Sequence, residues 1–169
     1  MADREISIAD PRSADVRGLL ERHLRFAYAQ VPPEDRHALD VEGLMDPAVT
    51  FYGLRVDGEL LAVGALKRID DDHAELKSMH TAEAARRRGL GRSMLGHLLR
   101  VAGALGFTRV SIETGSVPAF APARALYASA GFTACGPFAQ YRASPNTTFM
   151  TLALSNQGFS KGRHEDPAL

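Results

Sequence analysis

The feature that most constrains this chain is a predicted strand in which the alternation of apolar and polar residues shifts by one position. A basic turn with two glycines, a helix and a second strand follow it. Within residues 73–81 the period-2 pattern requires an apolar residue at position 78, but Ser78 stands there and Met79 follows it. This slip predicts a β-bulge near Ser78. Apolar residues then recur at helical spacing over residues 90–105, and residues 107–113 alternate again. A right-handed crossover would make the two strands parallel neighbours.

The remaining periodic segments predict one α/β domain over residues 1–154, with a mixed, mostly antiparallel sheet of six or seven strands and about four helices. Asp57-Gly58 is typical of a type I′ hairpin turn. Residues 155–169 are polar and without period, which predicts a mobile C-terminal tail. The other expected elements are a strand at 5–8, helices at 13–30, 34–44 and 118–130, hairpin strands at 50–56 and 60–69, and closing strands at 132–135 and 148–154.

Composition excludes several classes of function. The chain has 20 Lys+Arg against 20 Asp+Glu, so its formal net charge is zero, which argues against a general nucleic-acid or membrane-surface binder. Cys135 is the single cysteine, and the six histidines show no H-E-x-x-H spacing, so we expect no disulfide and no metal site. Neither a signal peptide nor a run of 18 apolar residues is evident. A reducing, cytoplasmic setting fits these features best.

The basic turn over residues 86–92 carries the strongest chemical signal. Its glycines let the backbone turn tightly and expose N–H groups, and the positive end of the following helix adds to them, which favours a diphosphate ligand. The arginines would add charge-assisted contacts. Neither the P-loop pattern nor G-x-G-x-x-G is present. By itself, such a turn could equally be an ordinary loop.

Two spaced motifs resemble those of the GNAT acyl-CoA-dependent N-acetyltransferases. Their pyrophosphate loop, Q/R-x-x-G-x-G/A, is matched by Arg86, Gly89 and Gly91. Their later signature, A-x-x-L-Y followed by x-x-x-G-F, is matched by Ala123, Leu126, Tyr127, Gly131 and Phe132. The resemblance covers roughly residues 5–154. It implies a sheet that splays between its fourth and fifth strands and admits the pantetheine arm of acetyl-CoA there.

The resemblance also implies which residues hold acetyl-CoA. Main-chain groups of Met79 and Thr81 would pair with pantetheine as an added strand does. His80, beside the bulge, is a further candidate, although a single histidine there is more often structural. Ala123 and Tyr127 would lie on the pantetheine side of the last helix. The pyrophosphate would rest on Arg86, Arg87, Arg88, Gly89, Leu90, Gly91 and Arg92.

Acetyl transfer to an amine needs a neutral nucleophile, stabilisation of the oxyanion and a proton for the departing thiolate. Tyr127 is the candidate acid, and a main-chain N–H at Met79 would meet the oxyanion. Glu75 or Glu113 would act as the base, directly or through water, although either could instead be a solvent-facing charge on a strand. Cys135 has no paired histidine in this reading, so we expect direct transfer in a ternary complex.

The acceptor side should be formed by the segment from Tyr28 to Glu34 and by the loop that contains Tyr141 and Arg142. Arg142 with Tyr141 would suit an acceptor carboxylate, and Glu34 or Glu113 would suit an amine. The sequence thus predicts transfer of an acetyl group to a primary amine of a small molecule.

Two other functions and one assembly state are compatible with the same residues. A non-catalytic module that binds acyl-CoA and regulates a partner has the same signature. The arginines at positions 86, 87, 88, 92 and 100 could form a nucleic-acid surface, although the neutral net charge opposes this. The sequence is compatible with a homodimer, and it identifies neither the acceptor nor the preferred acyl length.

Overall fold

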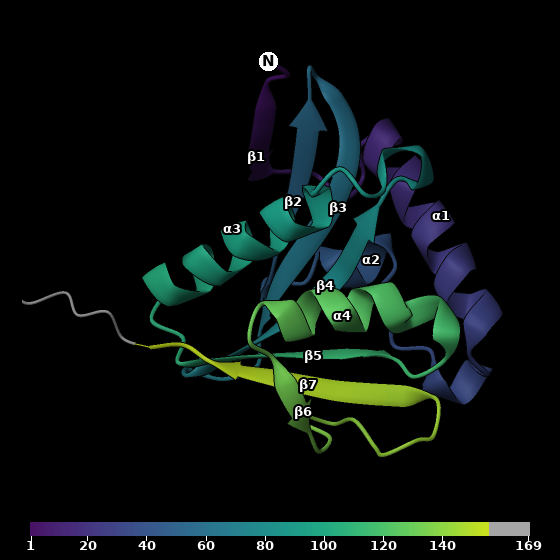
Figure 1. The fold of residues 1–169 in the computed structure, drawn as a ribbon, viewed down its shortest axis with the longest axis vertical. Helices are drawn as coiled ribbons and strands as arrows, with labels where there is room; N and C mark the ends of the chain where they lie inside the picture. Colours follow the sequence, from purple (N-terminus) through teal and green to yellow (C-terminus); the bar gives the residue numbers. More distant parts are fainter. Residues whose placement is uncertain (156–169) are drawn as a thin grey trace, which may run out of the picture.

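A computed structural model describes residues 1–155, which form a seven-stranded sheet in the order β1-β2-β3-β4-β5-β7-β6 (Figure 1). Among the described residues, β4 and β5 are the one parallel pair. The strands are β1 (Arg4–Ile8), β2 (Val49–Val56), β3 (Glu59–Arg68), β4 (His73–Thr81), β5 (Arg109–Gly115), β6 (Thr133–Cys135) and β7 (Thr147–Ala153). The α-helices are α1 (Ala14–Gln30), α2 (Val41–Leu44), α3 (Leu90–Ala104) and α4 (Ala121–Ser129). The expected mixed sheet with four helices is confirmed.

Each face of the sheet carries its own apolar core. Helices α3 and α4 cover one face and lie in front of the sheet in Figure 1, with Met94, Leu98 and Tyr127 buried against it. Helices α1 and α2 cover the opposite face, where Leu19 and Leu44 pack on it. Because both faces are covered, the central strands are buried on both sides, and polar residues on them must find partners or border a cavity.

The predicted hairpin and bulge are both present. Asp57 and Gly58 have φ values of 49° and 85°, as a type I′ turn requires. Ser78 has φ 55°, and the pairing of β3 with β4 shifts register opposite it, on either side of Gly64. A Cβ on Gly64 would lie 2.8 Å from the Met79 sulfur, so the glycine leaves room for the bulged strand.

The parallel pair is short, and this opens the centre of the sheet. β4 and β5 pair at three positions, the last of which joins Glu75 to Ser111. Beyond it β4 continues through Thr81 beside β3, while β5 continues to Gly115 beside β7. The two strands therefore diverge, and the predicted splay is confirmed.

The helix expected over residues 34–44 is wrong. The segment forms a 3₁₀ turn at Pro33–Asp35, an extended stretch and the four-residue α2, whose N-cap is Asp40 with Oδ1 2.8 Å from the Gly43 N–H. Acidic side chains that bond to backbone or loop groups compete with a continuous helix. The last helix is also shorter than predicted, because a 3₁₀ turn at Pro118–Phe120 precedes α4.

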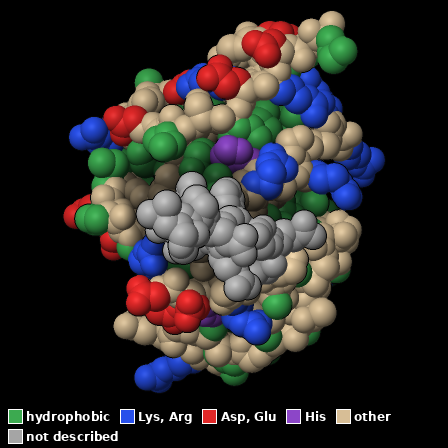
Figure 2. Space-filling model, turned by 90° about the vertical axis from the view of Figure 1, so that its left-hand side faces the viewer, with side chains coloured by type: hydrophobic (Ala, Val, Ile, Leu, Met, Phe, Trp, Pro, Cys, Tyr) green, Lys and Arg blue, Asp and Glu red, His purple; other side chains and the backbone are tan. Residues whose placement is uncertain are grey.

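Two further expectations concern the ends and the surface. The mobile tail predicted for residues 155–169 lies, apart from its first residue, outside the described residues, and the single domain over residues 1–154 stays a prediction. Within residues 1–155 no helix combines the length and apolarity needed to cross a bilayer. Figure 2 shows one face of the molecule with acidic and basic side chains both present and neither sign covering it, in keeping with the neutral net charge.

Candidate active site

A cavity of about 650 Å³ occupies the space where β4 and β5 diverge. Its walls include residues 76–81 of β4 and residues 112–115 of β5. The turn before α3, the first part of α4, the second half of α1 and the connection after α1 complete it. The cavity thus brings together the two sequence motifs and the bulged strand, which lie far apart in the chain.

One end of the cavity is basic. Arg86, Arg87 and Arg92 line it, and the Arg86 guanidinium lies 5.7 Å from the centre of the Phe26 ring. Gly89 has φ 77° and directly precedes α3, whose first-turn N–H groups have no acceptor within the helix. Free N–H groups beside arginines fit an anion such as the diphosphate of CoA.

Not every residue of the basic turn faces the cavity. Arg88 is not part of its lining, and its carbonyl accepts a hydrogen bond from Arg4 Nη2 at 3.1 Å. Leu90 lines the cavity from within the core, since only 1% of it is exposed. Gly91 lines the cavity beside α4, and a Cβ there would make an ordinary contact with Leu126 at 3.4 Å.

Tyr127 and Ala123 line the cavity from α4. Tyr127 is 3% exposed, and burial raises the pKa of its phenol above the ordinary value. The hydroxyl therefore stays protonated at neutral pH, and among residues 1–155 it has no hydrogen-bond partner. A buried, protonated and unpartnered phenol can donate to a group placed in the cavity.

Glu113 lines the cavity from β5. Burial raises the pKa of its carboxyl to about 7, Lys77 opposes this rise, and Glu75 and Asp35 add to it. Within the described part of the chain no side chain or backbone group donates a hydrogen bond to this carboxyl. Glu113 is therefore a free carboxyl that exchanges a proton near neutral pH, which is suited to acid–base chemistry.

Glu75, the other predicted carboxyl, belongs to a buried network instead. Its Oε1 lies 3.1 Å from Lys77 Nζ and accepts a short hydrogen bond from the Tyr141 hydroxyl. The same ammonium lies 2.7 Å from the Tyr141 oxygen. Glu75 is 3% exposed and does not line the cavity, whereas Lys77 does. The network joins β4 to the loop between β6 and β7.

The three residues around the bulge face different ways. Met79 lines the cavity and also packs partly against the core that α3 covers. His80 packs on His23 of α1 with ring centres 5.0 Å apart, and both rings line the cavity, as does Thr81. Burial lowers the pKa of His80 to about 3 and that of His23 to about 4, so both imidazoles are neutral at physiological pH.

The residues predicted for the acceptor side lie only in part at the cavity. Tyr28 lines the cavity, but Glu34, Tyr141 and Arg142 do not, and Glu34 and Arg142 are exposed. Sequence reasoning missed Asp35, Arg36, His37 and Lys77, all of which line it. The sequence did offer an indication of Lys77, because it lies two positions from the candidate carboxyl Glu75 and therefore on the same face of β4. It offered none of the other three, since a helix was expected there.

Long-range contacts fix the connection that carries these residues. Asp35 Oδ2 accepts hydrogen bonds from Ser144 Oγ at 2.7 Å and Asn146 Nδ2 at 2.9 Å, which also lowers the pKa of Asp35. His37 packs edge-on against the Tyr141 ring at 4.9 Å. The connection after α1 and the loop before β7 therefore form one wall.

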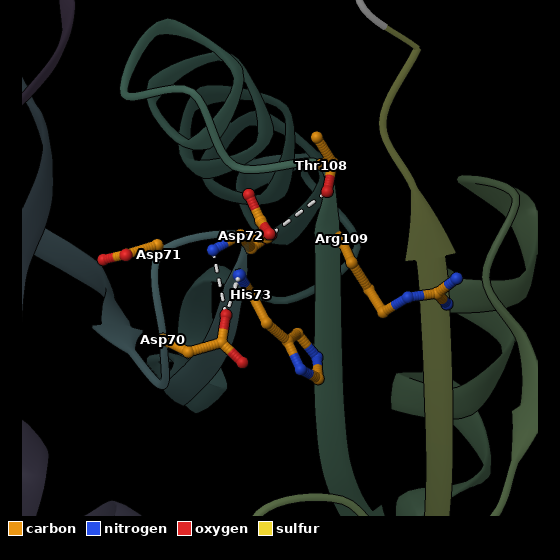
Figure 3. A pocket seen from close by; sticks show the side chains of 6 residues that line it. All are labelled: Asp70, Asp71, Asp72, His73, Thr108 and Arg109. Atoms are coloured by element: carbon orange, nitrogen blue, oxygen red, sulfur yellow. Dashed lines mark hydrogen bonds between the residues drawn. The ribbon is translucent and has the colours of Figure 1, made fainter.

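A second, shallower hollow lies at the other end of β4 and β5 (Figure 3). Asp70 Oδ1 accepts hydrogen bonds from the N–H groups of Asp72 and His73 at 2.9 and 2.8 Å, and the Asp72 carbonyl accepts one from Thr108. These bonds shape the turn into β4, and none of the six residues that line this hollow lines the larger cavity.

Comparison with known proteins agrees with this geometry. The model of the Acetyltransferase (GNAT) family matches residues 15–132. An uncharacterised N-acetyltransferase of Bacillus subtilis, YsnE, is 42% identical over 149 residues, which are 88% of this chain and 99% of that protein. Another from Escherichia coli, YedL, is 43% identical over 139 residues, 82% of this chain and 87% of that one.

Solved structures share the fold. The crystal structure of a putative acyl-CoA N-acyltransferase from Klebsiella pneumoniae has a TM-score of 0.73 at 23% identity, covering 90% of this chain and 98% of that one. A GNAT acetyltransferase from Elizabethkingia anophelis with acetyl-CoA bound has a TM-score of 0.66 at 16% identity, covering 89% and 98%. With the family match, these findings show that the chain belongs to the Acetyltransferase (GNAT) family and is an acyl-CoA-dependent N-acetyltransferase.

Proposed function

We propose that this enzyme moves the acetyl group of acetyl-CoA directly to the primary amine of a small molecule, with both substrates bound together. One observation carries the proposal: a carboxyl with a pKa of about 7, Glu113, and a protonated buried phenol, Tyr127, line the same cavity between the diverging strands. This is the pair that transfer between a thioester and an amine requires.

The proposed reaction balances without a covalent enzyme intermediate. The amine nitrogen attacks the thioester carbon, and its surplus proton passes to Glu113 directly or through water. The bond between carbon and sulfur then breaks, and Tyr127 gives its proton to the departing thiolate. The main-chain N–H of Met79 would stabilise the oxyanion.

Glu113 is the better candidate base of the two carboxyls. Glu75 accepts from both Lys77 and Tyr141 and does not line the cavity, so its use as a base would break a buried network. Removing one member of a buried ion pair is strongly unfavourable. Glu113 has neither constraint.

For acetyl-CoA we propose that Met79 and Thr81 pair with pantetheine through their backbones, with His80, Ala123 and Tyr127 beside it. The diphosphate would rest on the turn from Arg86 to Arg92. In this turn Arg86, Arg87 and Arg92 would contribute their charges, and Arg88 only its backbone.

Replacing Tyr127 with Phe tests the proposed acid. We expect kcat to fall roughly 10- to 1000-fold while the affinity for acetyl-CoA changes little, because the ring remains and only the hydroxyl is lost. Release of the CoA thiol over a panel of amines measures the rate, and calorimetry measures acetyl-CoA binding. Tyr52→Phe is the matched control, since Tyr52 is 8% exposed in the core but does not line the cavity.

Unchanged turnover in Tyr127→Phe would remove the phenol from the mechanism. Tight acetyl-CoA binding without turnover of any amine by the unaltered enzyme would instead contradict the proposed reaction.

The setting of the enzyme is also proposed. The single cysteine, Cys135, suits a cytoplasmic protein, and the neutral net charge suits a small-molecule acceptor better than nucleic acid or a membrane surface. We expect no metal requirement, and a homodimer stays a prediction.

A further inference from the structure

At the end of the cavity that we assign to the acceptor, two carboxyl side chains and two cationic side chains contribute to the lining. Asp35 and Glu113 supply the carboxyl groups, and Arg36 and Lys77 supply the cations. Carboxylates alone would suffice to attract an acceptor whose only charge is its amine. The two cations therefore need a separate explanation, and the hydrogen bonds of the four groups provide it.

The two carboxyl groups differ in whether other side chains already donate hydrogen bonds to them. Asp35 accepts from Ser144 and Asn146, and its role is to hold two loops together. Glu113 has no hydrogen-bond donor among residues 1–155. Of the two carboxyls, Glu113 is the one whose oxygens remain available for an incoming amine.

Lys77 keeps bonding capacity toward the cavity. Its ammonium has three N–H donors, of which Glu75 and Tyr141 take two. These two partners do not line the cavity, whereas Lys77 does. Its charge also acts on the carboxyl of Glu113 more strongly than any other charged group and lowers the pKa of that carboxyl. A positive charge held by two hydrogen bonds, with one N–H donor not taken by them, thus lines the same cavity as Glu113.

Arg36 is held in place at a solvent-exposed part of the cavity lining. Its Nε donates to the Val31 carbonyl at 3.3 Å, its Nη2 donates to the Tyr28 carbonyl at 3.1 Å, and its guanidinium lies 4.9 Å from the centre of the Tyr28 ring. A guanidinium has five N–H donors, so most of them remain for a ligand. Because the side chain is already ordered, binding an anion there costs little conformational entropy.

We propose that the acceptor is a small amino acid-like molecule, whose amine meets Glu113 and whose carboxylate meets Lys77, with Arg36 drawing the carboxylate in from the solvent-exposed part of the lining. This inference rests on the proposed amine acetylation and narrows its substrate class. Lys77 and Glu113 both line this cavity, from the two strands that diverge, which favours an amine and a carboxylate carried by one small molecule.

The experiment compares each standard L-amino acid with its methyl ester and with the amine that lacks only the carboxylate. CoA thiol release gives kcat/KM for each compound. We expect the best amino acid to exceed both analogues by about 10- to 100-fold, the range for one charge-assisted contact. An ester has the less basic amine, so a preference for the free acid cannot arise from easier deprotonation.

Two variants locate the carboxylate. Arg36→Gln should lower kcat/KM several-fold more for the best amino acid than for its decarboxylated analogue. Lys77→Gln combined with Glu75→Gln removes the buried charges together, so neither is left unpaired, and thermal unfolding checks that the protein folds. This double variant should abolish the preference for the acid. Calorimetric titration of the amino acid into the enzyme with CoA should show the same loss of binding without turnover.

The outcomes separate the two proposals. If no amine of any class releases CoA, the proposed function fails and this inference with it. If amines are acetylated but those without a carboxylate, or diamines, react as well or better, the function stands and this inference is overturned. An unchanged preference for the acid in both variants would also overturn it.

Discussion

At the scale of single residues, Glu113 as the proposed base should make the rate depend on pH. Its carboxyl has a pKa of about 7 because the cavity buries it, and a base must be ionised to accept a proton. We therefore expect Glu113 to contribute one limb to the pH profile: below pH 7 its protonation lowers kcat/KM about tenfold per pH unit, beside the separate limb that titration of the acceptor amine gives. The rate should be measured from pH 5 to 9 in the unaltered enzyme and in Glu113→Gln. The Gln variant should be slow, and its kcat/KM should not show the limb below pH 7 that Glu113 contributes. If that limb persists in the variant, it belongs to another group.

At the scale of elements, the bulge in β4 depends on Gly64 of β3. A Cβ at this position would lie 2.8 Å from the Met79 sulfur and from Met94, and 3.0 Å from Leu98. Gly64→Ala should therefore destabilise the protein by about 1–3 kcal/mol, as overpacking does, and raise the KM for acetyl-CoA by displacing the strand.

Thermal unfolding and acetyl-CoA kinetics measure both effects of Gly64→Ala. The matched control is Gly103→Ala in α3, where a Cβ would meet nothing within 4 Å and better helix propensity should stabilise slightly. Equal behaviour of the two variants would show that the fit around the bulge is looser than its geometry indicates.

Elements with local causes could be predicted from the sequence, and elements with distant causes could not. The hairpin follows from Asp57-Gly58, and the bulge follows from one slipped residue at Ser78. The connection after α1 depends on bonds from Asp35 to side chains more than 100 residues away, which no local pattern contains. The same applies to the site: motifs predicted the basic turn that lines one end of the cavity, while the charged residues of the connection after α1 were placed at the cavity only by the fold.

At the scale of the whole molecule, the site lowers the stability of the fold. The pKa of Glu113 rises from 4.5 to about 7 on folding. Below pH 4.5 the carboxyl is protonated in both the folded and the unfolded state, so it does not lower the free energy of unfolding there. As the pH rises from 4.5 to 7, only the unfolded state ionises freely, and stability falls. Glu113→Gln should therefore stabilise the protein by up to about 3 kcal/mol at pH 8 and by much less at pH 5.

Chemical denaturation at these two pH values measures the effect. The same variant should be nearly inactive, so that a gain in stability accompanies a loss of catalysis. An equal change in stability at both pH values would mean that the carboxyl titrates alike in the folded and unfolded states.

The wall built by Asp35 with Ser144 and Asn146, and by His37 with Tyr141, has a consequence for how this enzyme could acquire new acceptors. The connection after α1 and the loop before β7 hold each other in place by hydrogen bonds and ring packing. Exchanging only one of them for that of a relative would leave the hydrogen-bonding groups of the other without partners. Retargeting by grafting should therefore succeed only when both stretches are exchanged as a pair.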